Sequence, residues 1–150
     1  MIKTVRCTSE NSDFQNLVTQ LDIDLNSRYG AIQAQYNQYN KINSIKNVIV
    51  AYNEEIPVGC GCFKKYDDET IEIKRMFVKS ENRGFGIANR ILTELENWAI
   101  QEGYKNSILE TGIEQPEANC LYKKLGYSII ENYGQYKGNP NSICMKKSFF

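Results

Sequence analysis

Four segments before residue 80 place their apolar residues in the short alternating or continuous runs typical of β-strands. They are residues 2–8, 47–52, 56–65 and 70–79. The polar sequences Asn53-Glu54-Glu55 and Asp67-Asp68-Glu69 separate the last three segments. Because short polar breaks of this kind join neighbouring strands, residues 47–79 are predicted to form an antiparallel meander.

Helical spacing of apolar residues interrupts this pattern between the first two strands. Ser12-Asp13-Phe14-Gln15 fits a capping box, a common helix start. The apolar residues that follow at helical spacing are Phe14, Leu17, Val18, Leu21 and Leu25. Residues 31–42 are rich in Gln, Asn and Tyr, and they predict a second helix or a loop.

The second half of the chain alternates between helices and strands. Its clearest helix carries one apolar stripe, formed by Ile87, Ala88, Ile91, Leu92, Leu95, Trp98 and Ala99. Gly103 suits the C-terminal cap of that helix, and Pro116 suits the first turn of another that ends at Gly126. Strands are predicted at 106–111, 127–132 and 142–147. The whole pattern predicts an α/β fold with a mixed sheet.

Composition narrows the class of protein. A chain of 150 residues is expected to form a single domain over residues 1–150. Lys+Arg and Asp+Glu are both 18, and this neutral balance argues against nucleic acid as the main partner. No apolar stretch approaches the ~20 residues that span a bilayer, and the N-terminus lacks the apolar core of a signal peptide. A cytoplasmic protein without a membrane partner is therefore expected.

The sequence contains no histidine, which excludes Ser-His-Asp triads, Cys-His dyads and the commonest zinc sites. Five cysteines are scattered along the chain, and Cys60-Gly61-Cys62 lacks the two-residue gap of a zinc or redox pair. Reduced thiols and no metal are therefore expected. Any chemistry has to use carboxylate, phenol, thiol, amine, backbone or water.

The segment between the third meander strand and the next helix carries the strongest functional signal. Met76, Phe77 and Val78 end the strand, and Arg83-Gly84-Phe85-Gly86 leads into the helix that begins near Ile87. The first N–H groups of a helix have no partner inside it and attract anions. Glycine lets a ligand approach the backbone closely, and arginine adds a fork of donors for phosphate oxygens. The alternative is a surface loop that uses glycine only to turn.

Three phosphate-binding patterns compete for this loop. A P-loop needs Gly-x-x-x-x-Gly-Lys-Ser/Thr, and the chain contains no such run. The dinucleotide fingerprint, which would indicate a nicotinamide-dependent oxidoreductase, needs a third glycine where Asn89 stands. The third pattern, Arg/Gln-x-x-Gly-x-Gly/Ala, fits Arg83-Gly84-Phe85-Gly86-Ile87-Ala88 at every fixed place.

Through this loop the chain resembles the GCN5-related N-acetyltransferases, the GNAT superfamily, in which the six-residue pattern is the pyrophosphate loop for acetyl-coenzyme A. The stretch Asn119-Cys120-Leu121-Tyr122-Lys123-Lys124-Leu125-Gly126-Tyr127 resembles the late helix-to-strand segment of the same family. The resemblance runs from about residue 48 to 149. It implies the element order βααβββαβαββ and an acetyl-CoA-dependent N-acetyltransferase.

The resemblance also implies where acetyl-CoA binds. The pyrophosphate is expected at the glycine loop, and the pantetheine arm along backbone groups left free at the end of the preceding strand. The implied cofactor-binding residues are Met76, Phe77, Val78, Arg83, Gly84, Phe85, Gly86, Ile87, Ala88 and Asn119. Asn119 has the alternative role of a helix-surface amide.

Glu72 is the first candidate for the general base. An amine with a pKa of about 10.4 is mostly protonated at pH 7, and freeing its lone pair costs about 4–5 kcal/mol. A carboxylate can take that proton directly or through water. Strand alternation puts Glu72 on one face together with Lys74, Met76 and Val78. The alternative is an exposed carboxylate paired with Lys74 or another neighbour.

Tyr122 is the candidate general acid, because the leaving thiolate of CoA needs a proton and many members of the family use the tyrosine of this motif. Its alternative role is that of a core aromatic. Cys120 suggests an acyl-enzyme, but no base is evident near it, so direct attack in a ternary complex is favoured and Cys120 is expected to be packed.

The acceptor is expected to be a primary amine of a small molecule or a peptide. The fold places several side chains on the acceptor side, namely Arg28, Tyr29, Tyr36, Tyr39, Tyr133 and Tyr136. Glu110 would hold an ammonium group or form a strand-end salt bridge. The competing hypothesis is a non-catalytic acyl-CoA-binding or sensing module. A homodimer is compatible with the family resemblance.

Overall fold

The computed structural model describes residues 1–29 and 44–150. The helix or loop expected at residues 31–42, with Tyr36 and Tyr39, lies outside the described residues. The side chains of Arg28 and Tyr29 lie outside them as well.

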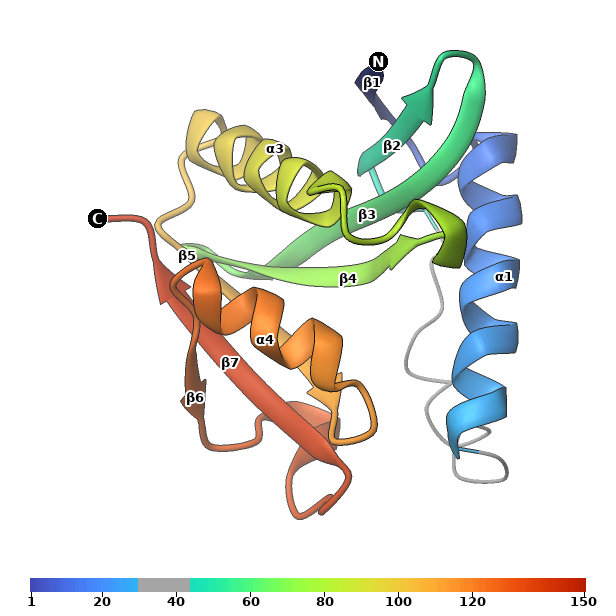
Figure 1. Ribbon diagram of the computed structural model, residues 1–150. Helices are drawn as coiled ribbons and strands as arrows, with labels where there is room; N and C mark the ends of the chain where they lie inside the picture. The colour runs from blue at the N-terminus through green and yellow to red at the C-terminus, as the bar shows by residue number, and fades with distance from the viewer. Residues whose placement is uncertain (30–43) are drawn as a thin grey trace.

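Within the described residues, seven strands form one sheet in the order β1-β2-β3-β4-β5-β7-β6 (Figure 1). They are β1 (Ile2–Cys7), β2 (Asn47–Asn53), β3 (Ile56–Asp67), β4 (Thr70–Val78), β5 (Asn106–Gly112), β6 (Ser128–Ile130) and β7 (Ser142–Ser148). The strands β2, β3 and β4 pair antiparallel in sequence order, which confirms the predicted meander. Only β4 and β5 pair in parallel.

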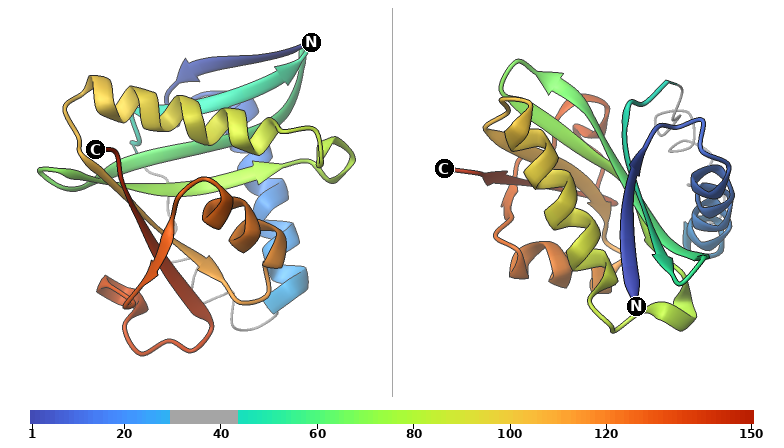
Figure 2. Two further views of the ribbon diagram at one scale, coloured as in Figure 1. Left: turned by 60° about the vertical axis from the view of Figure 1, so that its left-hand side comes forward. Right: turned by 90° about the horizontal axis from the view of Figure 1, so that it is seen from above.

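Helices cover both faces of the sheet (Figure 2). Helix α1 (Ser12–Tyr29) lies on one face, and α3 (Ile87–Gln101) and α4 (Pro116–Lys124) lie on the other. None of the helices in the described part of the chain is long and apolar enough to cross a membrane. The mixed sheet between these two helical layers confirms the expected α/β class.

The start of α1 differs from the predicted capping box. The Phe14 N–H donates to Oδ1 of Asn11 at 3.0 Å, and the Gln15 side chain donates to the carbonyl of Ser9. The cap is therefore Asn11 rather than Ser12. Asparagine caps as well as serine does, so sequence alone did not separate two adjacent candidates.

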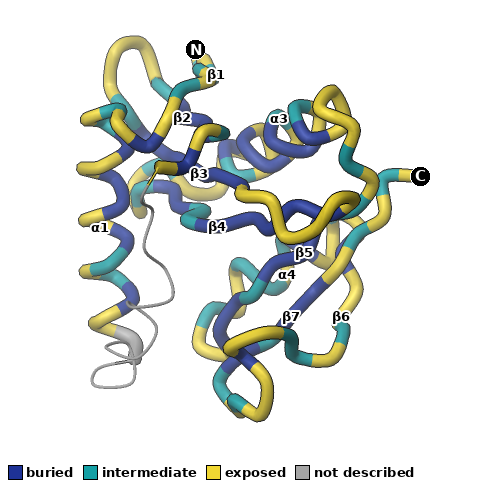
Figure 3. Tube along the Cα trace, turned by 180° about the vertical axis from the view of Figure 1, so that it is seen from behind, coloured by how far each residue is buried: buried dark blue, intermediate teal, exposed yellow. Residues whose placement is uncertain are grey.

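Two apolar clusters hold the layers together. Ile91, Leu92 and Leu95 of α3 are fully buried against one face of the sheet. Phe14 and Leu17 of α1 are equally buried against the opposite face. The buried segments run through the middle strands of the sheet (Figure 3). This packing fixes the central strands, which carry the site.

A β-bulge interrupts β4 at Arg75. Cys62 of β3 lies opposite Lys74 and Cys60 lies opposite Phe77, so β4 has one residue more than β3 between these pairs. Arg75 has a φ of 58°, a left-handed value that is uncommon outside glycine. Its guanidinium donates to the carboxylate of Asp22 on α1.

The bulge overturns the prediction that four side chains of this strand share a face. Ile73 packs in the cluster under α3, so its neighbours Glu72 and Lys74 point to the opposite face. After the bulge, Met76 and Val78 pack with the α3 cluster instead. The extra residue reverses the alternation, and it separates Glu72 and Lys74 from Met76 and Val78.

Strands β4 and β5 pair over only part of their length. Residues Thr70–Ile73 pair with Asn106–Leu109, and among the described residues β4 and β5 do not pair with each other beyond this segment. Beyond that point β4 stays paired with β3, and β5 stays paired with β7 up to Gly112. The two strands therefore diverge and leave an opening in the middle of the sheet.

Candidate active site

The opening between β4 and β5 leads into a cleft of about 420 Å³. The end of β4, the loop after it, the start of α3, one side of α4 and part of α1 form its walls. Among its lining residues are Met76, Phe77, Val78, Arg83, Gly84, Gly86, Ile87, Ala88, Leu121 and Tyr122. The cleft therefore gathers most of the residues predicted to bind acetyl-CoA.

The glycine loop is open toward this cleft. Gly84 and Gly86 have φ values of 86° and 80°, and Gly86 is the N-cap of α3. A Cβ at either position would meet nothing within 4 Å, so the glycines are needed for their backbone conformation and leave free space beside it. The N–H groups at the start of α3 have no intrahelical partner. This arrangement suits an anionic ligand.

Arg83 joins the loop to the end of β4. Its Nε donates to the carbonyl of Val78 at 2.8 Å, and its Cζ lies 5.7 Å from the ring centroid of Phe77. A guanidinium has five N–H donors, so this bond leaves donors for phosphate oxygens. Arg83 therefore both holds the loop and lines the cleft.

Two residues predicted to bind the cofactor are absent from the cleft wall. Phe85 is 77% exposed at the tip of the loop. Asn119 donates from Nδ2 to the carbonyl of Gly112 at 3.3 Å, which ties α4 to the end of β5. Its Oδ1 is buried and has no hydrogen-bond partner among the described residues. As the structure stands, the amide of Asn119 fixes a strand end rather than facing the cleft.

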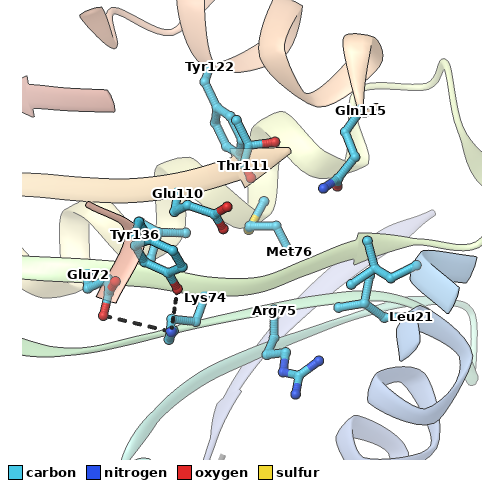
Figure 4. A pocket seen from close by; sticks show the side chains of 12 residues that line it. Leu21, Glu72, Lys74, Arg75, Met76, Glu110, Thr111, Gln115, Tyr122 and Tyr136 are labelled. Carbon is cyan, nitrogen blue, oxygen red and sulfur yellow. Dashed lines mark hydrogen bonds and ion pairs between the residues drawn. The ribbon is translucent and has the colours of Figure 1, made fainter. Parts of the chain in front are cut away.

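A second, smaller cavity of about 80 Å³ adjoins the cleft, and Figure 4 shows the side chains that line it. Four residues line both spaces, namely Leu21, Met76, Gln115 and Tyr122. The polar residues of the small cavity include Glu72, Lys74, Glu110, Thr111 and Tyr136. Glu110 and Tyr122 both lie at this cavity, although they come from different elements (Figure 4). A molecule in the cleft would meet one in the small cavity beside Tyr122.

Glu72 is buried and hydrogen-bonded rather than exposed. Only 3% of its surface is accessible, and its Oε2 accepts a hydrogen bond from the Tyr133 hydroxyl at 2.7 Å. The ammonium groups of Lys64 and Lys74 lie 3.7 and 3.9 Å from its Oε1. The alternative of an exposed carboxylate is wrong, whereas the expected pairing with Lys74 is present.

Glu110 carries a carboxyl group whose pKa is raised. Burial raises its pKa to about 7, and the Glu72 charge acts in the same direction. A hydrogen bond with Ser142 and the charge of Lys74 oppose that rise. A carboxyl with a pKa near 7 is divided between its two protonation states at neutral pH, which suits a proton acceptor.

No local pattern in the sequence indicates the raised pKa of Glu110. The residues next to Glu110 in the sequence indicate only that a strand ends there. Its side chain is buried by residues of other elements, namely α4, β4 and β7. The only usable signal was its position on β5, beside the predicted opening and twelve residues before the candidate acid in the printed sequence.

Tyr122 is buried at the junction of the two cavities. Burial, with a contribution from the Glu110 charge, raises the pKa of its phenol well above the ordinary value. Tyr122 is therefore protonated at neutral pH and can donate a proton. The core-aromatic alternative is also partly right, because its ring packs in the apolar cluster under α3.

Two tyrosines among the remaining candidates lie beside the charged residues of the small cavity. Tyr136 lines the small cavity, with its hydroxyl 3.4 Å from Nζ of Lys74, and Tyr133 donates a hydrogen bond to Glu72.

Cys120 is exposed on α4, so the expectation that it is packed is wrong. All five cysteines are free thiols. Across residues 1–29 and 44–150, no cluster of three or more acidic or thiol side chains is arranged to bind a metal ion.

Comparison with known proteins identifies the family. The profile of the acetyltransferase (GNAT) domain matches residues 44–129. The IAA acetyltransferase of Azospirillum brasilense is 30% identical over 145 residues, which are 93% of this chain and 95% of that protein. The chain therefore belongs to the GNAT acetyltransferase family.

Solved structures share the fold along the whole chain. A candidate acyl-CoA N-acyltransferase of Klebsiella pneumoniae superposes with a TM-score of 0.83 at 24% identity, covering 100% of this chain and 99% of that one. A GNAT family acetyltransferase of Elizabethkingia anophelis, solved with acetyl-CoA bound, superposes with a TM-score of 0.70 at 20% identity, covering 98% and 97%. These likenesses extend the family fold to the described residues before residue 48, where the resemblance of the sequence motifs does not reach.

Proposed function

We propose that this protein is an acetyl-CoA-dependent N-acetyltransferase that acts on the primary amine of a small molecule or a peptide. The observation that carries the proposal is the opening between β4 and β5, which joins a cleft with a glycine loop to a cavity with a carboxylate of raised pKa. Two substrates can enter from different sides and meet at Tyr122.

Acetyl-CoA would bind in the larger cleft. The N–H groups at the start of α3 and the guanidinium of Arg83 would hold its pyrophosphate. The unpaired edge of β4 from Met76 to Val78 offers backbone groups to the pantetheine arm. The acetyl-CoA bound to the Elizabethkingia relative supports this cosubstrate.

The acceptor amine would bind in the small cavity beside Glu110. Its nitrogen gives up a proton to the carboxylate and attacks the thioester carbon, forming a C–N bond. The C–S bond then breaks, and the Tyr122 hydroxyl protonates the leaving thiolate. The proton on Glu110 passes to the Tyr122 phenolate, directly or through water, which restores both groups. The products are the N-acetylated amine and free CoA, and no acyl-enzyme forms.

Glu72 and Glu110 are the two candidates for the base. Glu72 already accepts a hydrogen bond from Tyr133 and lies near the side-chain nitrogens of Lys64 and Lys74. Glu110 is the carboxyl whose pKa lies near the working pH. We assign proton acceptance to Glu110, and we assign Glu72 to holding Lys74 and Tyr133 around the cavity.

The test is the release of free CoA thiol from acetyl-CoA against a panel of amines that includes an aminoglycoside, a polyamine, amino acids and a peptide with a free N-terminus. We expect amine-dependent thiol release that falls about a hundredfold or more in Tyr122→Phe, with acetyl-CoA binding retained. Tight acetyl-CoA binding without turnover on any amine would indicate the non-catalytic module instead. Binding of NAD in place of acetyl-CoA would indicate an oxidoreductase.

A further inference from the structure

Thr111 presents a buried hydroxyl that has no hydrogen-bond partner in residues 1–29 and 44–150. Only 4% of its surface is accessible. The residue lines the small cavity and lies close to Tyr122 and Glu110 (Figure 4). Buried polar groups in proteins are nearly always hydrogen-bonded, so this hydroxyl requires an explanation.

Packing alone does not explain the hydroxyl. Valine has the same branched shape as threonine and would avoid the cost of an unpaired polar group. The cross-strand neighbour of Thr111 on β7 is Ile143, so an apolar side chain would be compatible with its surroundings. The hydroxyl is therefore best explained by a polar group that enters the cavity.

Strand alternation indicates which substrate supplies that group. Leu109 packs in the cluster under α3, so Thr111 points to the same face, which α4 and Tyr122 cover. Glu110 points to the opposite face, where its cross-strand partner Cys144 packs with Tyr136. In the proposed function the amine approaches Glu110. Thr111 instead shares its face with Tyr122, which lines both cavities and would meet the thioester.

We propose that the Thr111 hydroxyl donates a hydrogen bond to the carbonyl oxygen of the acetyl group. The bond strengthens as that oxygen gains negative charge in the tetrahedral transition state. β4 would supply backbone N–H groups from one wall of the opening, and Thr111 would add a side-chain donor from the other wall. The inference rests on the proposed function, because it requires an acetyl thioester at the junction of the two cavities.

The experiment measures binding of acetyl-CoA and of CoA to the wild type, Thr111→Val and Thr111→Ser by titration calorimetry. The ratio of the two dissociation constants measures how much the acetyl group contributes to binding. We expect Thr111→Val to lower the preference for acetyl-CoA about three- to tenfold, and to leave CoA binding unchanged. Thr111→Ser keeps the hydroxyl and should keep the preference. With an amine substrate, kcat of Thr111→Val should fall on the order of a hundredfold.

A second readout excludes a structural role. Because the hydroxyl has no partner among the residues that the structure describes, Thr111→Val should melt at the same temperature as the wild type or higher. A clear loss of stability, or an unchanged preference for acetyl-CoA, would overturn the inference. A wild type that binds neither CoA nor acetyl-CoA would overturn the proposed function as well, so the two failures are distinguishable.

Discussion

The ring of Tyr122 packs edge-on against the ring of Tyr127, with centroids 5.9 Å apart and planes at 63°. The Tyr127 hydroxyl donates to Oε2 of Glu96 at 2.9 Å and lies 2.8 Å from Oγ of Ser107. Lys147 donates to the other oxygen of Glu96, also at 2.9 Å. A buried hydrogen-bonded network that joins α3, β5 and β7 therefore holds the ring of Tyr127, against which the proposed acid Tyr122 packs.

Tyr127→Phe should weaken this support while keeping the ring. Removal of the hydroxyl leaves Glu96 with one fewer partner in a buried place, which should cost about 1–3 kcal/mol of unfolding free energy. We also expect kcat to fall severalfold, because the aromatic ring that packs against Tyr122 would be held less firmly. Urea unfolding and steady-state kinetics measure the two effects. Tyr104→Phe is the matched control, since Tyr104 packs edge-on against Phe63 away from this network. Equal losses in both variants would contradict the role of the network.

Glu110 should make stability depend on pH. Its carboxyl has a folded-state pKa of about 7 against an ordinary value of 4.5, so the folded protein binds more protons between these values. Stability from this group is therefore present below pH 4.5 and is lost as pH rises through 7. The loss is on the order of 3 kcal/mol, at about 1.36 kcal/mol per pKa unit.

Glu110→Gln should accordingly stabilise the free protein at pH 8 and change little at pH 4.5. Unfolding midpoints of wild type and variant across this range provide the measurement. Glu131→Gln, at an exposed site, should show no such pH-dependent difference. A constant difference between Glu110→Gln and wild type at all pH values would refute the raised pKa.

The same carboxyl should control the rate. If Glu110 accepts the proton, kcat/KM rises with pH up to about 7, and Glu110→Gln abolishes that limb and lowers kcat about 10²–10⁴-fold. Glu72→Gln should retain the limb, because we assign Glu72 to contacts with Tyr133 and Lys74 and not to accepting the proton of the amine. The pH profile of amine-dependent thiol release distinguishes them. Loss of the pH-dependent limb in Glu72→Gln alone would identify Glu72 as the general base instead.

Gly86 and Gly103 offer a matched test of the loop. Both have left-handed φ values, 80° and 94°, and a Cβ at either position would meet nothing within 4 Å. Alanine should therefore destabilise both variants similarly, by about 1–2 kcal/mol. Gly103 lies at the far end of α3, so only Gly86→Ala should also weaken acetyl-CoA binding, by tenfold or more. Calorimetric titration of both variants tests this, and equal affinities would remove the loop from the cofactor site.

Much of the fold could be predicted because its signals are local. The apolar stripe of the helix after Gly86, the polar turns of the meander and the glycine loop each depend on neighbouring residues. The one-residue bulge at Arg75 could not be predicted in this way. It depends on pairing with β3, and it reverses the faces of all later β4 residues.

The candidate site divides in the same manner. The sequence by itself determined the loop from Arg83 to Gly86 and the position of Tyr122, because a motif of fixed spacing carries each of them. Only the tertiary structure decided that Glu110 has a raised pKa, that Asn119 holds a strand end and that Thr111 lacks a partner within the described part of the chain. Burial and hydrogen bonding come from residues far apart in the chain, so no local pattern encodes them.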